Sequence, residues 1–183
     1  MYELDVWMTQ AINGLAGQNG LADQIMVLVS SMGVPLLVLA VAVQWWRKSD
    51  RLYIRHVLVA AGLSFLLGLG VNQIILLFLS RIRPYDGGIT HLLIERSADP
   101  SFPSDHGTVT FAIAAAFLFH GMERRGRAFL SAAILVAFSR VYIGTHYASD
   151  VLGGALIGIL AAGTIFVFYK PGTRVDRIVT EKL

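Results

Sequence analysis

The sequence SRVYIGTHYASD, residues 139–150, runs directly into the apolar stretch VLGGALIGILAAGTIFVFY, residues 151–169. An arginine, a histidine and an aspartate therefore border a segment of nearly the length needed to cross a bilayer, about 20 residues. Ionisable groups in or beside membrane segments are costly and mark functional sites. This part of the chain predicts a membrane helix with a polar site at its N-terminal end.

The composition of the whole chain agrees with a membrane protein. Of its 183 residues, 55% are hydrophobic and only 15% are charged, whereas soluble domains carry about 25% charged residues. The absence of cysteine excludes disulfides and thiolate metal sites. We predict an all-α integral membrane helical bundle with no nucleic-acid partner. The formal charge of +3 is small, and its distribution along the chain matters more than the sum.

Five segments are predicted to span the membrane. Residues 24–46, 57–80 and 151–169 are uncharged runs that suit the thickness of the hydrocarbon layer. Residues 107–122 and 128–145 are shorter or interrupted, and they become long enough if their motif residues lie at the embedded ends. These five spans complete the predicted bundle.

The rest of the chain extends this core at both ends. Residues 1–22 are predicted to form an interfacial helix, because Leu4, Trp7, Met8 and Ile12 have helical spacing. Residues 24–170 form the core, and residues 171–183 form a cytoplasmic tail. We expect a single membrane domain over residues 1–183, and the sequence predicts no oligomeric state.

Basic residues predict the orientation, since cytoplasmic loops are enriched in lysine and arginine. Eleven of the 15 basic residues fall on one side of the predicted spans. The four on the other side are Arg81, Arg83, Arg96 and Arg140. We therefore expect a multi-pass membrane protein, with its N-terminus outside the cytoplasm and its motif residues on the extracytoplasmic side.

His146 and Asp150 are four residues apart, so a helix places both on one face. An aspartate that accepts one ring N–H fixes the histidine tautomer and leaves the other nitrogen as a nucleophile or base. Histidine can attack phosphorus and form a covalent intermediate. The alternative is a structural pair that caps the start of a span.

The tetrapeptide Pro103–Ser104–Asp105–His106 precedes another predicted span. Ser104 or Asp105 can cap the helix that Gly107 continues, which leaves backbone N–H groups pointing outward. Such a terminus binds anionic oxygen, and a histidine in its first turn can give a proton to a leaving group. On its own, the tetrapeptide is equally compatible with a simple turn and N-cap.

Arg83 and Arg140 supply positive charge near the same membrane boundary. Guanidinium groups match phosphate oxygens with paired donors, and phosphoryl transfer depends on positioning and charge stabilisation. The alternative, in which an arginine extends to lipid headgroups, suits Arg96 better than Arg140, which has apolar neighbours. Arg81 fits either role.

Together, Arg83–Pro84, Pro103–Ser104–Asp105–His106 and Ser139–Arg140…His146…Asp150 resemble the motifs of the type-2 phosphatidic acid phosphatase superfamily. The resemblance covers the site and residues 57–169. It implies a helical bundle and metal-independent lipid phosphatase activity through a phosphohistidine. It also implies that His146 is the nucleophile, Asp150 its orienting partner and His106 the general acid and then base. The implied phosphate-binding groups are Arg83, Arg140, Ser104 and the backbone near Asp105 to Gly107.

The sequence departs from the family pattern at two positions. The family's first motif begins with a lysine seven residues before the arginine, where this chain has Leu76, and we predict that Arg81 replaces it. Asp105 occupies a position that is often glycine. This Pro-Ser-Asp-His form resembles the bacterial undecaprenyl-diphosphate phosphatases of the bacitracin-resistance type.

The resemblance therefore predicts removal of the terminal phosphate of undecaprenyl diphosphate, and it implies a location in the bacterial inner (plasma) membrane. The alternatives are phosphatidylglycerophosphate, phosphatidic acid or lipid A phosphate as substrate, and a non-enzymatic lipid-binding or transport protein. We expect no cofactor and no metal, and the predicted partners are membrane lipids and the lipid-phosphate substrate. The remaining histidines have simpler interpretations, because His56 and His120 suit the cytoplasmic interface and His91 suits a solvated loop.

Overall fold

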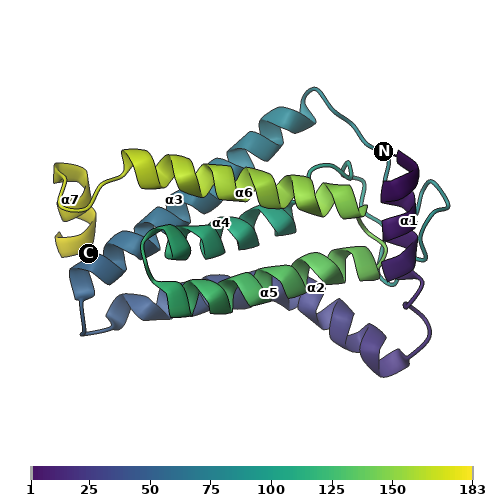
Figure 1. Cartoon of the computed structure of the whole chain (residues 1–183), viewed down its shortest axis with the longest axis horizontal. Helices are drawn as coiled ribbons and strands as arrows, with labels where there is room; N and C mark the ends of the chain where they lie inside the picture. Colours follow the sequence, from purple (N-terminus) through teal and green to yellow (C-terminus); the bar gives the residue numbers. More distant parts are fainter. Residues whose placement is uncertain (1, 183) are drawn as a thin grey trace.

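The computed structural model describes residues 2–182, which form helices and no strand. The prediction of an all-α fold is therefore confirmed for this part of the chain. Helices α2 to α6 lie along the long axis, α1 lies across one end, and α7 lies at the other end (Figure 1). In chain order the elements are α1 (Tyr2–Asn13), α2 (Gly20–Ala42), the short 3₁₀ helix η1 (Val43–Trp46), α3 (Arg51–Leu76), α4 (Asp105–Phe119), α5 (Glu123–Tyr142), α6 (Ala148–Phe168) and α7 (Arg174–Lys182).

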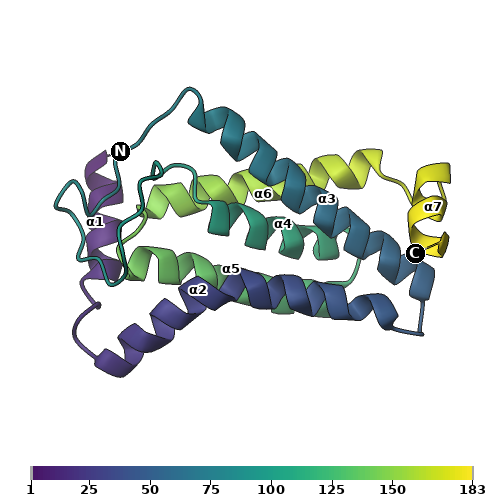
Figure 2. The same ribbon diagram turned by 180° about the vertical axis from the view of Figure 1, so that it is seen from behind.

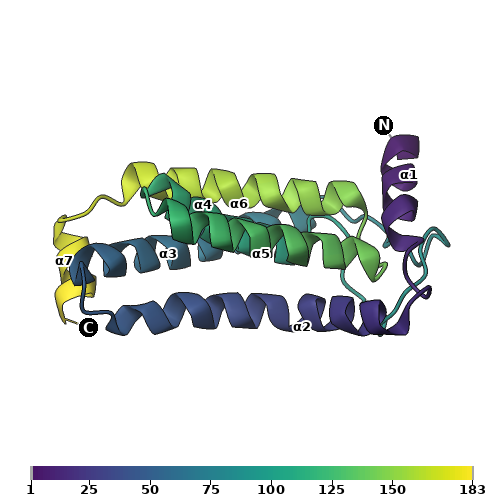
Figure 3. The same ribbon diagram turned by 60° about the horizontal axis from the view of Figure 1, so that its bottom comes forward.

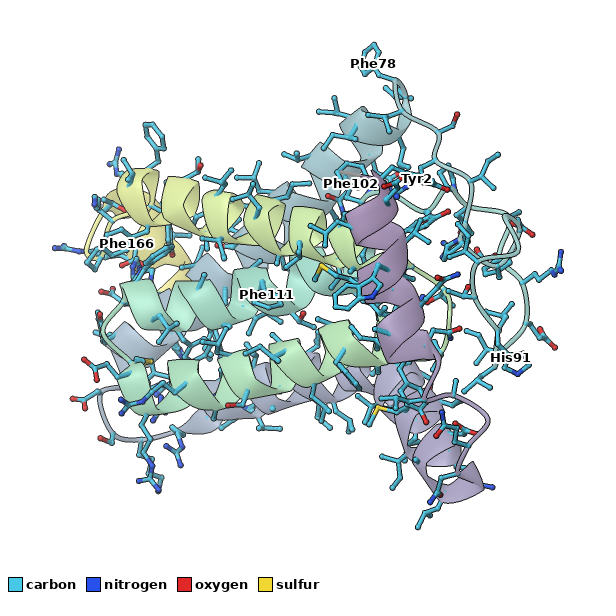
Figure 4. All side chains as sticks on the ribbon, turned by 45° about the vertical axis from the view of Figure 1, so that its right-hand side comes forward. Tyr2, Phe78, His91, Phe102, Phe111 and Phe166 are labelled. Atoms are coloured by element: carbon cyan, nitrogen blue, oxygen red, sulfur yellow. The ribbon has the colours of Figure 1, made fainter. Side chains whose placement is uncertain are left out.

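Each predicted span corresponds to a helix, but most of the boundaries differ by one to six residues. α3 ends at Leu76, whereas the uncharged run continues to Ser80. Phe78, just after the helix, is 85% exposed and points away from the other helices (Figure 4). Hydropathy could not locate this end, because residues 77–79 are as apolar as the helix before them.

Three helical segments are long and apolar enough to cross a membrane, namely Gly20–Trp46, Arg51–Leu76 and Ala148–Phe168. α4 is apolar but has only 15 residues, and α5 has 20 residues with a charged first turn. The chain is thus a multi-pass membrane protein. The five-span count remains a prediction.

α4 forms the centre of the bundle and packs between α3, α5 and α6 (Figure 2). Close approach of α4 and α6 depends on glycine, because a Cβ atom at Gly154 or Gly158 would collide with backbone atoms of α4 or of the residue before it. Small residues at this spacing let membrane helices approach closely. α2 lies to one side of α4 and α6, as Figure 3 shows.

At the end opposite α1, the tail folds into α7 and packs against the start of α3. The His56 ring nitrogen Nδ1 lies 2.8 Å from Asp176 Oδ1, and the hydroxyl of Tyr169 donates to the same oxygen at 2.7 Å. His56 is only 1% exposed and His120 only 8% exposed. Both histidines are therefore buried within this end of the bundle, and their interpretation as interfacial stays a prediction.

The functional motifs all lie at the α1 end. The segment between α3 and α4 and the turn between α5 and α6 meet there, next to α1 (Figure 1). Hydrogen bonds join the two segments, including a 3.1 Å bond from the Leu93 amide to the Ile143 carbonyl and a 2.9 Å bond from the Thr90 hydroxyl to the Gly144 carbonyl. Residues far apart in the sequence are in this way brought into one site.

Candidate active site

A cavity of about 400 Å³ lies at this end of the bundle. It is lined by His106 at the start of α4, His146 in the turn between α5 and α6, Arg83 in the segment after α3, and Arg140 in the last turn of α5. The structure therefore brings both predicted catalytic histidines and two of the predicted phosphate-binding arginines to a single space. Their convergence is the first requirement for a reaction at one phosphoryl group.

The ring of His146 is held by a backbone carbonyl. Its Nδ1 lies 2.8 Å from the carbonyl oxygen of Ser101, and a carbonyl can only accept, so Nδ1 carries the proton. The other nitrogen, Nε2, is left with its lone pair for the cavity that the ring lines. Burial lowers the pKa of His146, which favours the neutral, nucleophilic ring.

Asp150 supports this arrangement from behind His146, although not through the direct bond that the sequence suggested. Its Oδ2 lies 3.6 Å from His146 Nδ1, beyond hydrogen-bonding distance. The same carboxylate accepts the hydroxyl of Ser101 and the amide of Tyr147, at 2.9 Å. Ser101 therefore connects Asp150 to the His146 ring, through its hydroxyl and its carbonyl.

Arg83 and Arg140 are anchored by neutral groups. Arg83 donates from Nε to the Asp99 carbonyl at 2.8 Å and from Nη1 to the Thr145 carbonyl at 3.0 Å. Arg140 donates from Nη1 to the hydroxyl of Ser30 at 2.6 Å. Because these acceptors carry no charge, both guanidinium groups keep a full positive charge at the cavity. They are well suited to bind an anion.

Arg81 differs, and the structure does not bring it to the cavity. Its Nη1 lies 2.6 Å from Asp150 Oδ1 and its Nη2 lies 2.6 Å from Asp5 Oδ2. Two carboxylates thus neutralise its charge. We therefore assign Arg81 to Asp150 rather than to the phosphate, which corrects its interpretation as the replacement for the lysine missing at Leu76.

The second motif shapes the start of α4. Ser104 is fully buried and accepts a hydrogen bond from the Gly107 amide at 3.4 Å, as expected for an N-cap. Gly107 lies against α6, where a Cβ atom would meet the Val151 carbonyl at 2.9 Å. Neither residue lines the cavity, whereas Asp105 and His106 do. Ser104 and Gly107 therefore hold the helix in place rather than contact the cavity.

Sequence reasoning missed several residues of the site. Asn72 is fully buried and donates to Asp105 Oδ1 at 2.6 Å, so it fixes a carboxylate of the second motif. Gln73 lines the cavity one turn before Leu76, on the same face of α3. That helical spacing was a usable signal for Gln73. Ser101 carried none, because its role depends on the path of the connecting segment.

Comparison with known proteins identifies the family. The sequence profile of the PAP2 superfamily matches residues 57–174, which include every motif described above. The chain belongs to the PAP2 superfamily. It is therefore a phosphatase.

Two relatives and one solved structure are similar to this PAP2 phosphatase over most of its length. The chain is 35% identical over 164 residues to the undecaprenyl-diphosphatase BcrC of Bacillus subtilis strain 168, covering 88% of this chain and 80% of that protein. It is 31% identical over 171 residues to the bacitracin transport permease protein BcrC of Bacillus licheniformis, covering 91% and 80%. The crystal structure of a transmembrane PAP2-type phosphatidylglycerolphosphate phosphatase from Bacillus subtilis superimposes with a TM-score of 0.68 at 21% identity, covering 94% of this chain and 88% of that one. This likeness supports the fold.

Proposed function

We propose that this PAP2 phosphatase removes the terminal phosphate of undecaprenyl diphosphate through a phosphohistidine. The observation that carries the proposal is the meeting of His106, His146, Arg83 and Arg140 around one cavity. The choice of substrate is supported by similarity over most of the chain to an undecaprenyl-diphosphatase.

The proposed reaction begins at Nε2 of His146. This nitrogen attacks the terminal phosphorus and forms a P–N bond, while the bond from that phosphorus to the bridging oxygen breaks. His106 gives its proton to the departing oxygen, and undecaprenyl phosphate leaves. Water, deprotonated by His106, then attacks the phosphohistidine and releases inorganic phosphate.

The charges around the cavity suit the transferred group. Arg83 and Arg140 stabilise the equatorial oxygens, whose negative charge is spread in the transition state. The amides of Asp105 and His106, at the first turn of α4, have no acceptor within residues 2–182. They add two donors at the positive end of a helix.

The proposal includes a topology. All five helices from α2 to α6 would cross the plasma membrane of a bacterium, with the α1 end outside the cytoplasm. α1 would lie in the interface, where its exposed Leu4 and Trp7 contact lipid. The basic residues gathered at the other end support this orientation. Residues 1–183 would form a single domain, with residues 171–183 at the cytoplasmic end.

A substrate panel tests the proposed function. Undecaprenyl diphosphate, phosphatidylglycerophosphate and phosphatidic acid are compared at matched detergent mole fraction, with His146→Ala as the blank. We expect the highest kcat/KM for undecaprenyl diphosphate, by at least about 1.4 kcal/mol of transition-state stabilisation, which is tenfold. A higher kcat/KM for either glycerolipid would assign the site to that lipid instead.

Removal of metal ions gives a second prediction. Residues 2–182 contain no group of three or more histidine, aspartate or glutamate side chains arranged to hold a metal ion. Since the protein's own arginines and amides supply the positive charge, we expect phosphate release in excess EDTA to stay within about twofold of the untreated rate. Loss of activity in EDTA that magnesium restores would contradict the mechanism.

A further inference from the structure

α1 packs directly against the elements that carry the nucleophile. It crosses the end of the bundle beside the start of α6 and the end of α5 (Figure 4). It also precedes residues 57–174, over which the family profile matches. Three polar side chains on α1, those of Asp5, Thr9 and Asn13, face this part of the structure.

Asp5 and Thr9, on α1, cap the N-terminus of α6. The Ser149 amide donates to Asp5 Oδ1 at 2.9 Å, and the Ala148 amide donates to Thr9 Oγ1 at 3.0 Å. These amides belong to the first turn of α6, where backbone N–H groups lack partners inside the helix. A carboxylate at this position also interacts favourably with the helix dipole.

Asp5 also holds Arg81, and Arg81 holds Asp150. The guanidinium of Arg81 bridges the two carboxylates at 2.6 Å on each side, and it stacks 3.7 Å above the centre of the Tyr147 ring. Asp150 is fully buried, and a buried carboxylate is strongly destabilising without a charged partner. Arg81 supplies that partner, and Asp5 fixes the end of Arg81 that Asp150 does not reach.

Two further hydrogen bonds link Asp150 to His146, the proposed nucleophile. Asp150 accepts the hydroxyl of Ser101, and the carbonyl of Ser101 accepts from Nδ1 of His146. A displacement of Asp150 would therefore move Ser101 and turn the imidazole. Since an error of about 1 Å in positioning can cost about 10²-fold in rate, this path gives Asp5 a route to the reaction.

Asn13 binds the other end of the turn between α5 and α6, where α5 ends. Its side-chain amide donates to the Tyr142 carbonyl at 2.8 Å and to the His91 carbonyl at 2.9 Å, and its oxygen accepts the His91 amide at 2.7 Å. Asn13 is only 5% exposed and Thr9 is fully buried. α1 thus contacts the last residue of α5 and the first residues of α6, on both sides of His146.

We propose that α1 is a positioning element of the active site, in which Asp5 acts through Arg81 on Asp150 and so sets the orientation of His146. This inference rests on the proposed role of His146 as nucleophile. It assigns Asp5 and Arg81 as positioning residues, since neither lines the cavity.

A double-mutant cycle on the full-length protein tests it. We expect Asp5→Ala to lower kcat about 10- to 100-fold with KM within about twofold, because binding groups in the cavity are unchanged. In an Arg81→Ala background, Asp5→Ala should lower kcat by much less than it does in the wild type, because its route to Asp150 is already removed and only its contact with Ser149 is lost. Glu3→Ala is the matched control, an exposed carboxylate on the same helix, and it should leave kcat unchanged.

The isosteric variant Asp5→Asn distinguishes a loss of positioning from misfolding. Thermal unfolding in detergent is measured for each variant. Asp5→Asn should keep the unfolding temperature of the wild type and still lower kcat at least about threefold. A kcat equal to that of Glu3→Ala, or losses that multiply in the double variant, would overturn the proposal.

The choice of substrate does not affect this test. The ratio of variant to wild-type kcat is measured on both undecaprenyl diphosphate and short-chain phosphatidic acid, and we expect the same ratio on each. Preference for another lipid would overturn the proposed substrate alone. A kcat for Asp5→Ala equal to that of the wild type on both lipids would overturn the positioning role alone.

Discussion

His146→Ala should abolish phosphate release, with a fall in kcat of at least about 10⁴-fold on every lipid phosphate. In the proposed mechanism this side chain supplies the atom that forms the P–N bond, and no other imidazole that lines the cavity can take its place. His106 is the other histidine there, but it is needed to protonate the leaving oxygen. Loss of the nucleophile therefore leaves only binding and charge stabilisation.

A matched control separates loss of chemistry from loss of structure. His91→Ala removes an exposed imidazole at the same end of the molecule, on the connecting loop and outside the cavity lining (Figure 4). It should keep wild-type kcat. Substrate binding to His146→Ala, measured directly, should stay within about tenfold of wild type, because Arg83 and Arg140 remain in place.

Rapid quenching gives a more direct measurement of the same event. Wild-type protein mixed with lipid labelled in the terminal phosphate should carry acid-labile, base-stable label, as expected for phosphohistidine, and His146→Ala should carry none. Equal labelling of the two proteins would show that the phosphorus is attacked by another group, and would remove His146 from the proposed role.

Much of the site was predictable because its motifs carry charge in an apolar sequence. His106, His146, Arg83 and Arg140 stand out against hydrophobic neighbours, where a polar residue is costly. The structure brings all four to one cavity. The helices were predictable for a related reason, since an unbroken apolar run of about 20 residues has few alternatives to a membrane helix.

The remaining features depend on the path of the chain between the motifs. Arg81 and Arg83 are two residues apart, yet only Arg83 reaches the cavity while Arg81 turns toward Asp5 and Asp150. Composition and spacing do not distinguish them, because the connecting segment has no helical or strand period. Ser101 acts through its carbonyl, a group that every residue carries, so no residue type could indicate it.

His106→Ala should have unequal effects on the two classes of substrate. Cleavage of phosphatidic acid releases a glycerol alkoxide, a poor leaving group that needs a proton in the transition state, and we expect kcat/KM to fall about 10³-fold. Undecaprenyl diphosphate instead releases a phosphate whose own second pKa is about 6. That group can leave with little protonation, so we expect a fall of only about tenfold.

The effect of His106→Ala on the two substrates has to be compared as kcat/KM rather than as kcat. His106 also activates water in the second step, which is the same for every substrate, so kcat could fall equally on both once hydrolysis of the phosphohistidine limits turnover. The ratio kcat/KM reports the steps up to the first irreversible one, here the formation of the phosphohistidine. Equal losses in kcat/KM on phosphatidic acid and undecaprenyl diphosphate would mean that His106 does not protonate the leaving oxygen. An unchanged kcat/KM with a lower kcat would mean that His106 serves the water alone.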